Sequence, residues 1–201
     1  MRKAVVLLVL LALCGGAALA AGCGDGTAQA RTHMEQADRL SSGMRLLADD
    51  AAFDVAGLLA ELGVEVKESG TVNKQAVTDA ANEQLDRIIA NGEKARKEYA
   101  KILELEGADP YKEYARARIK AIEDTIKVLG PVGKLLEEIG SPSNTASIGA
   151  TVTEWAKANA GVAVRAVKAF ASWRSAARIR EKNNLGPEQE PAGDTSPGTA
   201  P

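Results

Sequence analysis

Histidine and clustered carboxylates are the first residues in this sequence whose types could support chemistry. The chain has one histidine, His33, which excludes a two-histidine zinc motif and the paired Glu-x-x-His motifs of a di-metal helical bundle. Asp50 and Asp54 are four residues apart beside Asp49, so their carboxylates share one helix face and could exchange protons if buried. We expect these carboxylates and His33 to be solvated, because charged side chains usually face water.

A glycine-rich stretch in the middle of the chain has a superficial likeness to a phosphate-binding loop. That loop needs four residues between its glycines and a hydroxyl residue after its lysine. Here two residues separate Gly130 from Gly133, and Leu135 follows Lys134. We interpret Gly130-Pro131 as a helix break or kink, and we expect no catalytic residue, metal site or cofactor.

The cysteines lie only in the N-terminal segment, at Cys14 and Cys23, which excludes a disulfide framework in the body of the chain. Two basic residues precede an apolar run over residues 4–13, and small residues continue to Cys23. This order is typical of an export signal. The apolar run is too short for an ordinary transmembrane helix.

The four residues Ala20-Ala21-Gly22-Cys23 resemble the lipobox of bacterial lipoproteins, with Ala20 in the position usually held by leucine. The resemblance covers residues 1–23. It implies a signal peptide over 1–22, lipid on the Cys23 thiol, and an extracytoplasmic protein anchored to a cell membrane or outer membrane. Cleavage after Ala18-Leu19-Ala20 with soluble release, or retention of the segment as a signal anchor, are the alternatives. We expect residues 23–30 to form the lipidated cysteine and a flexible tether.

Charge is unevenly distributed along the body. Removal of residues 1–22 leaves 23 basic and 27 acidic residues, a balance that argues against nucleic-acid binding. Residues 46–66 contain acids and no base, whereas residues 155–180 contain bases and no acid. We expect these two segments to pair within the fold. Alternatively, Arg165, Lys168 and Arg178 contact anionic lipid headgroups or an acidic partner.

Trp155, Phe170 and Trp173 lie on the apolar stripe of the last helical segment. Core packing is the expected role of aromatic residues on such a stripe. The alternative is that they line a small-ligand pocket between helices.

Four segments carry apolar residues at steps of three and four, over residues 32–62, 77–102, 111–139 and 148–177. This spacing predicts helices, with Asp109-Pro110 and Ser141-Pro142-Ser143-Asn144 marking boundaries. The sequence therefore predicts an all-α, elongated, antiparallel up-down-up-down four-helix bundle over 31–185, with a core of Ala, Leu, Val and Ile. Two long hairpins that open or pair with a second copy are the other architecture. The Pro- and Gly-rich residues 186–201 are expected to form a disordered tail.

These patterns favour a non-enzymatic interaction or scaffolding module of the cell envelope with an envelope protein as partner. A carrier with an apolar pocket is the second expectation. A hydrolytic or transfer enzyme is the third, but a nucleophile paired with a base is not evident in the sequence.

Overall fold

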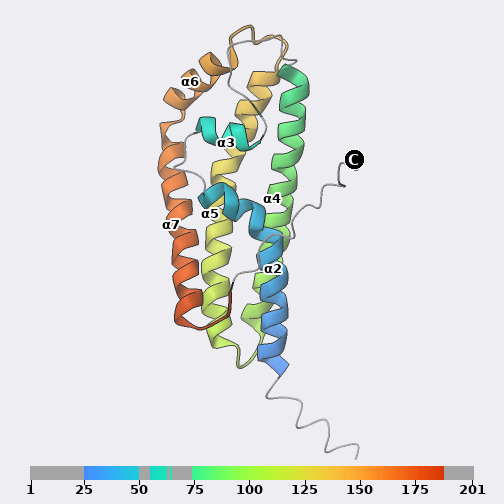
Figure 1. Ribbon diagram of the computed structural model, residues 1–201, viewed down its shortest axis with the longest axis vertical. Coiled ribbons are helices and arrows are strands. Elements are labelled where there is room, and N and C mark those ends of the chain that lie inside the picture. The colour runs from blue at the N-terminus through green and yellow to red at the C-terminus, as the bar shows by residue number, and fades with distance from the viewer. Residues whose placement is uncertain (1–24, 50–54, 63, 65–73, 188–201) are drawn as a thin grey trace, which may run out of the picture.

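Helices account for the architecture of the computed structural model, which describes residues 25–49, 55–62, 64 and 74–187 (Figure 1). In chain order they are α2 (Asp25–Asp49), α3 (Val55–Glu61), α4 (Lys74–Glu104), α5 (Asp109–Gly140), α6 (Ile148–Ala158) and α7 (Ala160–Lys182). The described ranges contain no strand. The prediction of an all-α fold is confirmed.

The helices form an elongated bundle in which α2 and α5 run one way and α4 and α6–α7 run the other (Figure 1). Helix α5 packs most extensively against α4 and α7, and α2 packs mainly against α4. Short connections force each helix to return beside its predecessor. The predicted up-down-up-down arrangement is therefore observed.

Aliphatic side chains and alanines fill the space between the helices, as predicted. Along α5 the fully buried residues recur at helical spacing, so that one stripe of the central helix faces its neighbours. This stripe includes Ala115, Ala121, Ile122, Val128, Leu129, Val132, Leu135 and Leu136. Alanines in such a stripe allow close helix packing, because their small side chains let neighbouring backbones approach each other.

Of the break or kink predicted at Gly130-Pro131, the break is wrong, because α5 continues through Pro131 to Gly140. Proline inside a helix removes one backbone hydrogen bond and costs about 3 kcal/mol. Burial of Val132 and Leu135 beyond the proline offsets this cost, at roughly 1.5–3 kcal/mol for each large side chain. Tertiary packing therefore decides the length of α5.

The last predicted helix is divided in two, and the first is described in two parts. The described parts of the predicted first helix are α2, which ends at Asp49, and α3, which begins at Val55. Residues 50–54 lie outside the described part of the chain. Helices α6 and α7 meet at Asn159, whose backbone N–H and side-chain Nδ2 both donate to the Trp155 carbonyl oxygen, at 2.9 and 3.0 Å. A side chain that competes for backbone groups in this way favours a helix end.

The predicted tether and tail boundaries also need correction. Helix α2 begins at Asp25, and Ala30 is fully buried, so residues 25–30 belong to the bundle and are not a flexible tether. Of the predicted tail 186–201, the structure describes Gly186 and Pro187, and their carbonyl oxygens accept hydrogen bonds from Arg180. Residues 188–201 lie outside the described part of the chain.

Helix boundaries elsewhere follow the sequence signals in part. The turn at 141–144 is observed, with Asn144 Nδ2 donating to the Glu138 carbonyl oxygen at 3.0 Å. Pro110 lies in the first turn of α5 as predicted, but Asp109 is the first helical residue and forms no side-chain cap. Gly107, which follows α4, has a φ of +69°, a conformation that glycine adopts without steric cost.

Gly92 on α4 marks a close approach to α2, because a Cβ atom there would overlap the end of the Met44 side chain. We predict that Gly92→Ala destabilises the wild-type protein but stabilises a Met44→Ala variant by about 1 kcal/mol, the helix-propensity gain. Gly43→Ala is the control, since its Cβ would lie 3.6 Å from Ile88. Chemical denaturation of the wild type and of each variant provides the measurement, and equal effects of Gly92→Ala in both backgrounds would contradict the predicted overlap.

Candidate functional site

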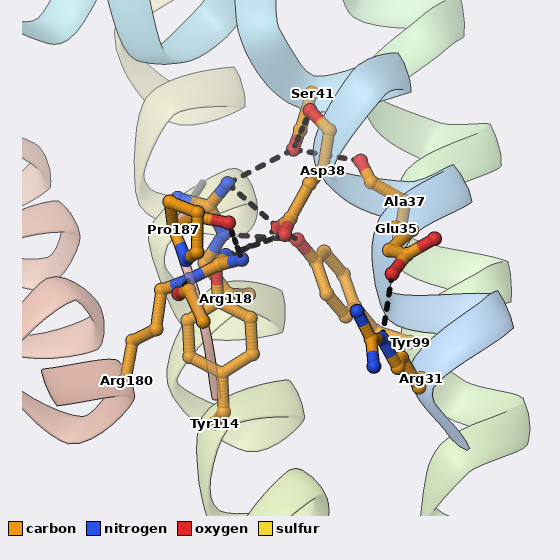
Figure 2. Close-up of polar contacts among 11 residues, drawn as sticks. Arg31, Glu35, Ala37, Asp38, Ser41, Tyr99, Tyr114, Arg118, Arg180 and Pro187 are labelled. Atoms are coloured by element: carbon orange, nitrogen blue, oxygen red, sulfur yellow. Dashed lines mark hydrogen bonds and ion pairs between the residues drawn. The ribbon is translucent and has the colours of Figure 1, made fainter. Parts of the chain in front are cut away.

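The most concentrated polar chemistry in the described structure surrounds the buried carboxylate of Asp38 on α2 (Figure 2). Tyr99 comes from α4, Tyr114 and Arg118 from α5, and Arg180 from α7. All five side chains are almost completely inaccessible to solvent. The cluster therefore connects α2, α4, α5 and α7 at one height along the bundle axis.

Both oxygens of Asp38 accept hydrogen bonds. Oδ1 accepts from the Tyr99 hydroxyl, from the Tyr114 hydroxyl at 2.8 Å and from Arg118 Nη2 at 3.1 Å. Oδ2 accepts from Arg180 Nη1 at 2.5 Å. Figure 2 shows the Asp38, Tyr99, Arg118 and Arg180 side chains converging from different helices. Such charge-assisted bonds compensate a carboxylate for the water that it loses on burial.

The two arginines also connect the cluster to its surroundings. Arg118 donates from Nε to the Tyr99 hydroxyl at 2.9 Å, and its guanidinium lies 4.3 Å from the centre of the Trp173 ring, within the range of cation–π attraction. Arg180 donates from Nε to the Gly186 carbonyl oxygen at 2.7 Å and from Nη2 to that of Pro187 at 2.6 Å. Arg180 thereby fixes the segment after α7 against the bundle.

The pKa shifts of Tyr99 and Arg180 agree with their burial in this cluster. Burial raises the pKa of Tyr99 well above its usual value of 10, with Arg118 opposing the shift. Burial alone would lower the pKa of Arg180, but Tyr114 and Asp38 outweigh it and the pKa lies above its ordinary value. The tyrosine is thus held neutral and the arginine charged.

A second buried carboxylate, Asp124 on α5, lies near the same Trp173. Asp124 Oδ2 accepts from the Ser172 hydroxyl at 2.9 Å and from Lys120 Nζ at 2.6 Å. Trp173 Nε1 donates to the Thr125 hydroxyl at 2.9 Å. Burial would raise the pKa of Asp124, but the Lys120 and Ser172 hydrogen bonds outweigh it and the pKa is lowered.

These clusters have the geometry of structural networks. Asp38 is saturated with donors and shut off from solvent, so a substrate could reach it only if the helices separated. Groups of three or more His, Cys, Asp or Glu side chains able to hold a metal do not occur among the described residues. A cavity of about 530 Å³ opens beside Arg180, lined by the end of α7 and residues 184–187.

The predicted basic contact residues are placed on the surface of α7. Arg165, Lys168 and Arg178 are all exposed, and Lys168 Nζ lies 3.9 Å from Asp124 Oδ1 on α5. Arg180 of the basic segment binds Asp38 on α2, an acid outside residues 46–66, so the expected pairing of the two charged segments stays a prediction. An acid on α5 therefore also lies beside a base of α7. The sequence pattern did not indicate this pairing.

The predicted aromatic residues do not gather at one point. Trp173 is buried beneath Arg118, Trp155 is buried on α6, and half-buried Phe170 has the Arg174 guanidinium 5.4 Å from its ring centre. Trp155 and Trp173 lie on opposite sides of the interruption at Asn159. The alternative of a ligand pocket shared by all three remains a prediction.

The other candidate residues differ in their surroundings. Cys23, Asp50 and Asp54 lie outside the described residues. His33 is within α2 and half-buried, with its Nδ1 atom 2.8 Å from Glu98 Oε2, so the expectation of a solvated histidine at a helix start is wrong. A hydrogen bond from Lys101 lowers the pKa of Glu98 despite partial burial, and the bond with His33 lowers it further.

The Asp38 cluster was not predicted, although the sequence holds a signal for it. Arg118 occupies the stripe position midway between Tyr114 and Ile122, four residues from each. Asp38 and Arg180 similarly follow the buried positions Met34 and Ala176 by four residues. A charged residue on an apolar stripe predicts a buried ion pair, but the sequence does not show which stripes meet.

Comparison with protein-family models, curated proteins and solved structures finds no significant match to this chain. Among the described helices, none combines the length and apolar character that a membrane span requires. The site defines the chain as a helical bundle with an ionic core.

We predict that Asp38→Ala lowers the free energy of unfolding by about 3–5 kcal/mol, because two arginines lose a buried partner. Tyr99→Phe should cost about 1–3 kcal/mol through one lost hydrogen bond. Glu35→Ala, in the same helix but paired with the largely exposed Arg31, is the control and should change stability by less than about 1 kcal/mol. Urea denaturation measures these values, and similar losses in Glu35→Ala and Asp38→Ala would contradict the assignment.

The lowered pKa of Asp124 predicts that the folded protein loses stability in acid. Its pKa is lower in the folded than in the unfolded protein, so its contribution is present above the unfolded pKa, about 3.9, and is lost as pH falls through the folded pKa. Asp124→Asn should therefore have a weaker pH dependence of unfolding below about pH 4. Urea titrations across this range provide the measurement, and identical pH profiles for both proteins would rule out the assignment.

Proposed function

We propose that this protein is a lipid-anchored, non-enzymatic helical module that presents a docking surface at the outer face of a bacterial membrane. The supporting sequence feature is the lipobox-like Ala20-Ala21-Gly22-Cys23 after a short apolar run. Diacylglyceryl transfer to the Cys23 thiol supplies two acyl chains, which suffice for stable anchoring.

The position of the first helix is the observation that carries this proposal. Helix α2 begins at Asp25, so Gly24 alone separates the proposed lipid from the bundle. Thr27 on α2 donates to the Gly107 carbonyl oxygen at 3.5 Å, which places the start of α2 beside the α4–α5 connection. A lipid on Cys23 would hold this end of the bundle at the bilayer.

The ionic core supports a docking role. A cluster that joins four helices fixes their register, and buried polar networks favour one arrangement over alternatives in some proteins. A bundle with fixed register presents its outer surfaces in a constant geometry. Such a surface can bind a partner without first paying an ordering cost.

We predict that Cys23→Ser releases the protein from the membrane fraction, because the anchor lacks its thiol acceptor. Cys14→Ser is the matched control and should leave the protein in the membrane fraction, since Cys14 precedes the proposed cleavage site. Cell fractionation and intact-protein mass spectrometry provide the measurement. A wild-type protein without diacylglyceryl mass, or a Cys23→Ser protein that is still membrane-bound, would contradict the anchor.

A further inference from the structure

The outward face of α7 combines exposed aliphatic and basic side chains. Its inward face is formed by Val162, Ala166, Ala169, Trp173 and Ala176, which pack into the core. On the opposite side, Val164 is 72% exposed and Val167 is 67% exposed. Among the described residues these two are the most exposed large aliphatic side chains.

The two valines belong to a continuous stripe, here called the α7 stripe. At 100° per residue, its members fall within one side of the helix opposite the buried face. The α7 stripe consists of Val164, Val167, Lys168, Ala171, Arg174 and Arg178, all of them exposed. It contains no acid, although the sequence from residue 23 onward carries more acidic than basic residues.

The basic end of the α7 stripe lies at the proposed anchored end of the bundle. Asn183, just after α7, has Nδ2 3.5 Å from the Pro110 carbonyl oxygen, and Lys182 Nζ lies 3.1 Å from Glu113 Oε1. Pro110 and Glu113 lie in the first turns of α5, and the start of α2 contacts Gly107 just before α5. The start of α2 and the end of α7 are therefore at the same end, as Figure 1 also shows.

We propose that the α7 stripe docks on an anionic lipid bilayer, so that the bundle lies on its α7 side against the membrane. The proposal rests on the lipid anchor of the proposed function. Basic side chains near an anionic surface are attracted to its headgroups, and aliphatic side chains beside them enter the boundary with the acyl chains. The α7 stripe supplies three bases for the first interaction, and Val164 and Val167 for the second.

The charge of the α7 stripe and its position near the proposed anchor favour an anionic bilayer over other binding partners. A second copy that docked through the same face would bring together two sets of the bases Lys168, Arg174 and Arg178 with no acid of the α7 stripe between them, and such like-charge contacts oppose association. An acidic protein would satisfy the charge but would have to find the surface by diffusion. The anchor instead keeps the bilayer next to the end of the bundle that holds Arg178.

The test uses the mature lipidated protein, which begins at Cys23, with Val167→Cys labelled with bimane and the protein reconstituted into vesicles. The vesicles contain phosphatidylcholine alone, or two parts phosphatidylcholine to one part phosphatidylglycerol. We expect a blue-shifted bimane emission, and quenching by lipids brominated on their acyl chains, only in the anionic vesicles. High salt should reverse both signals, because screening weakens the attraction.

Two matched variants control for position and charge. Bimane at Lys97→Cys, on an exposed site of α4, should give the same signal in both vesicles. Neutralisation of Lys168, Arg174 and Arg178 to Gln should reduce the equilibrium constant for docking, measured at Val167→Cys, by about fivefold per residue. Neutralisation of Arg87, Lys94 and Lys97 on α4, all exposed, removes the same charge and should leave docking unchanged.

The outcomes separate the docking surface from the anchor. Flotation with neutral vesicles reports the anchor, and protein without an added cysteine takes up no bimane if the Cys23 thiol is lipidated. Protein that floats but shows equal Val167→Cys signals in neutral and anionic vesicles would overturn the docking proposal alone. Disulfide-linked dimers through Val167→Cys in neutral vesicles would overturn it in favour of a second copy, and a blue shift that requires an added acidic protein would overturn it in favour of that partner.

Discussion

The Asp38 carboxylate imposes the constraint on which the rest of the bundle depends. A buried carboxylate is strongly unfavourable unless hydrogen bonds replace its water, and the donors here come from α4, α5 and α7. Each donor reaches Asp38 at only one axial position of its helix. If one helix shifted along its axis by one turn, about 5.4 Å, its donor would lose contact with Asp38. The cluster therefore selects the axial register of α2, α4, α5 and α7.

This constraint explains how a core of small residues specifies one arrangement. Alanines such as Ala37, Ala95 and Ala121 are fully buried and provide close approach, but their shape does little to distinguish one register from the next. The ionic cluster and the Asp124–Ser172 bond supply directional contacts. Arg180 extends the same network to Gly186 and Pro187, so that the chain beyond α7 is fixed as well.

The inward and outward faces of α7 have different roles. Its inner face carries Trp173 and Arg180, which join the ionic core, whereas its outer face carries exposed valines and bases. Because the inner contacts fix the rotation of α7 about its axis, they also determine which residues point outward. The surface that we propose for lipid docking is therefore set by the buried cluster on the other side of the same helix.

The sequence by itself determined the all-α class, the turn at 141–144 and the order of the columns, because helical periodicity and turn residues act locally. The tertiary structure decided the rest. Burial beyond Pro131 kept α5 continuous, and burial of Ala30 brought residues 25–30 into α2. The pairing of Asp38 with Arg180, 142 residues apart, depends on which helix faces meet. Periodicity identifies a buried face, but it does not identify the face that covers it.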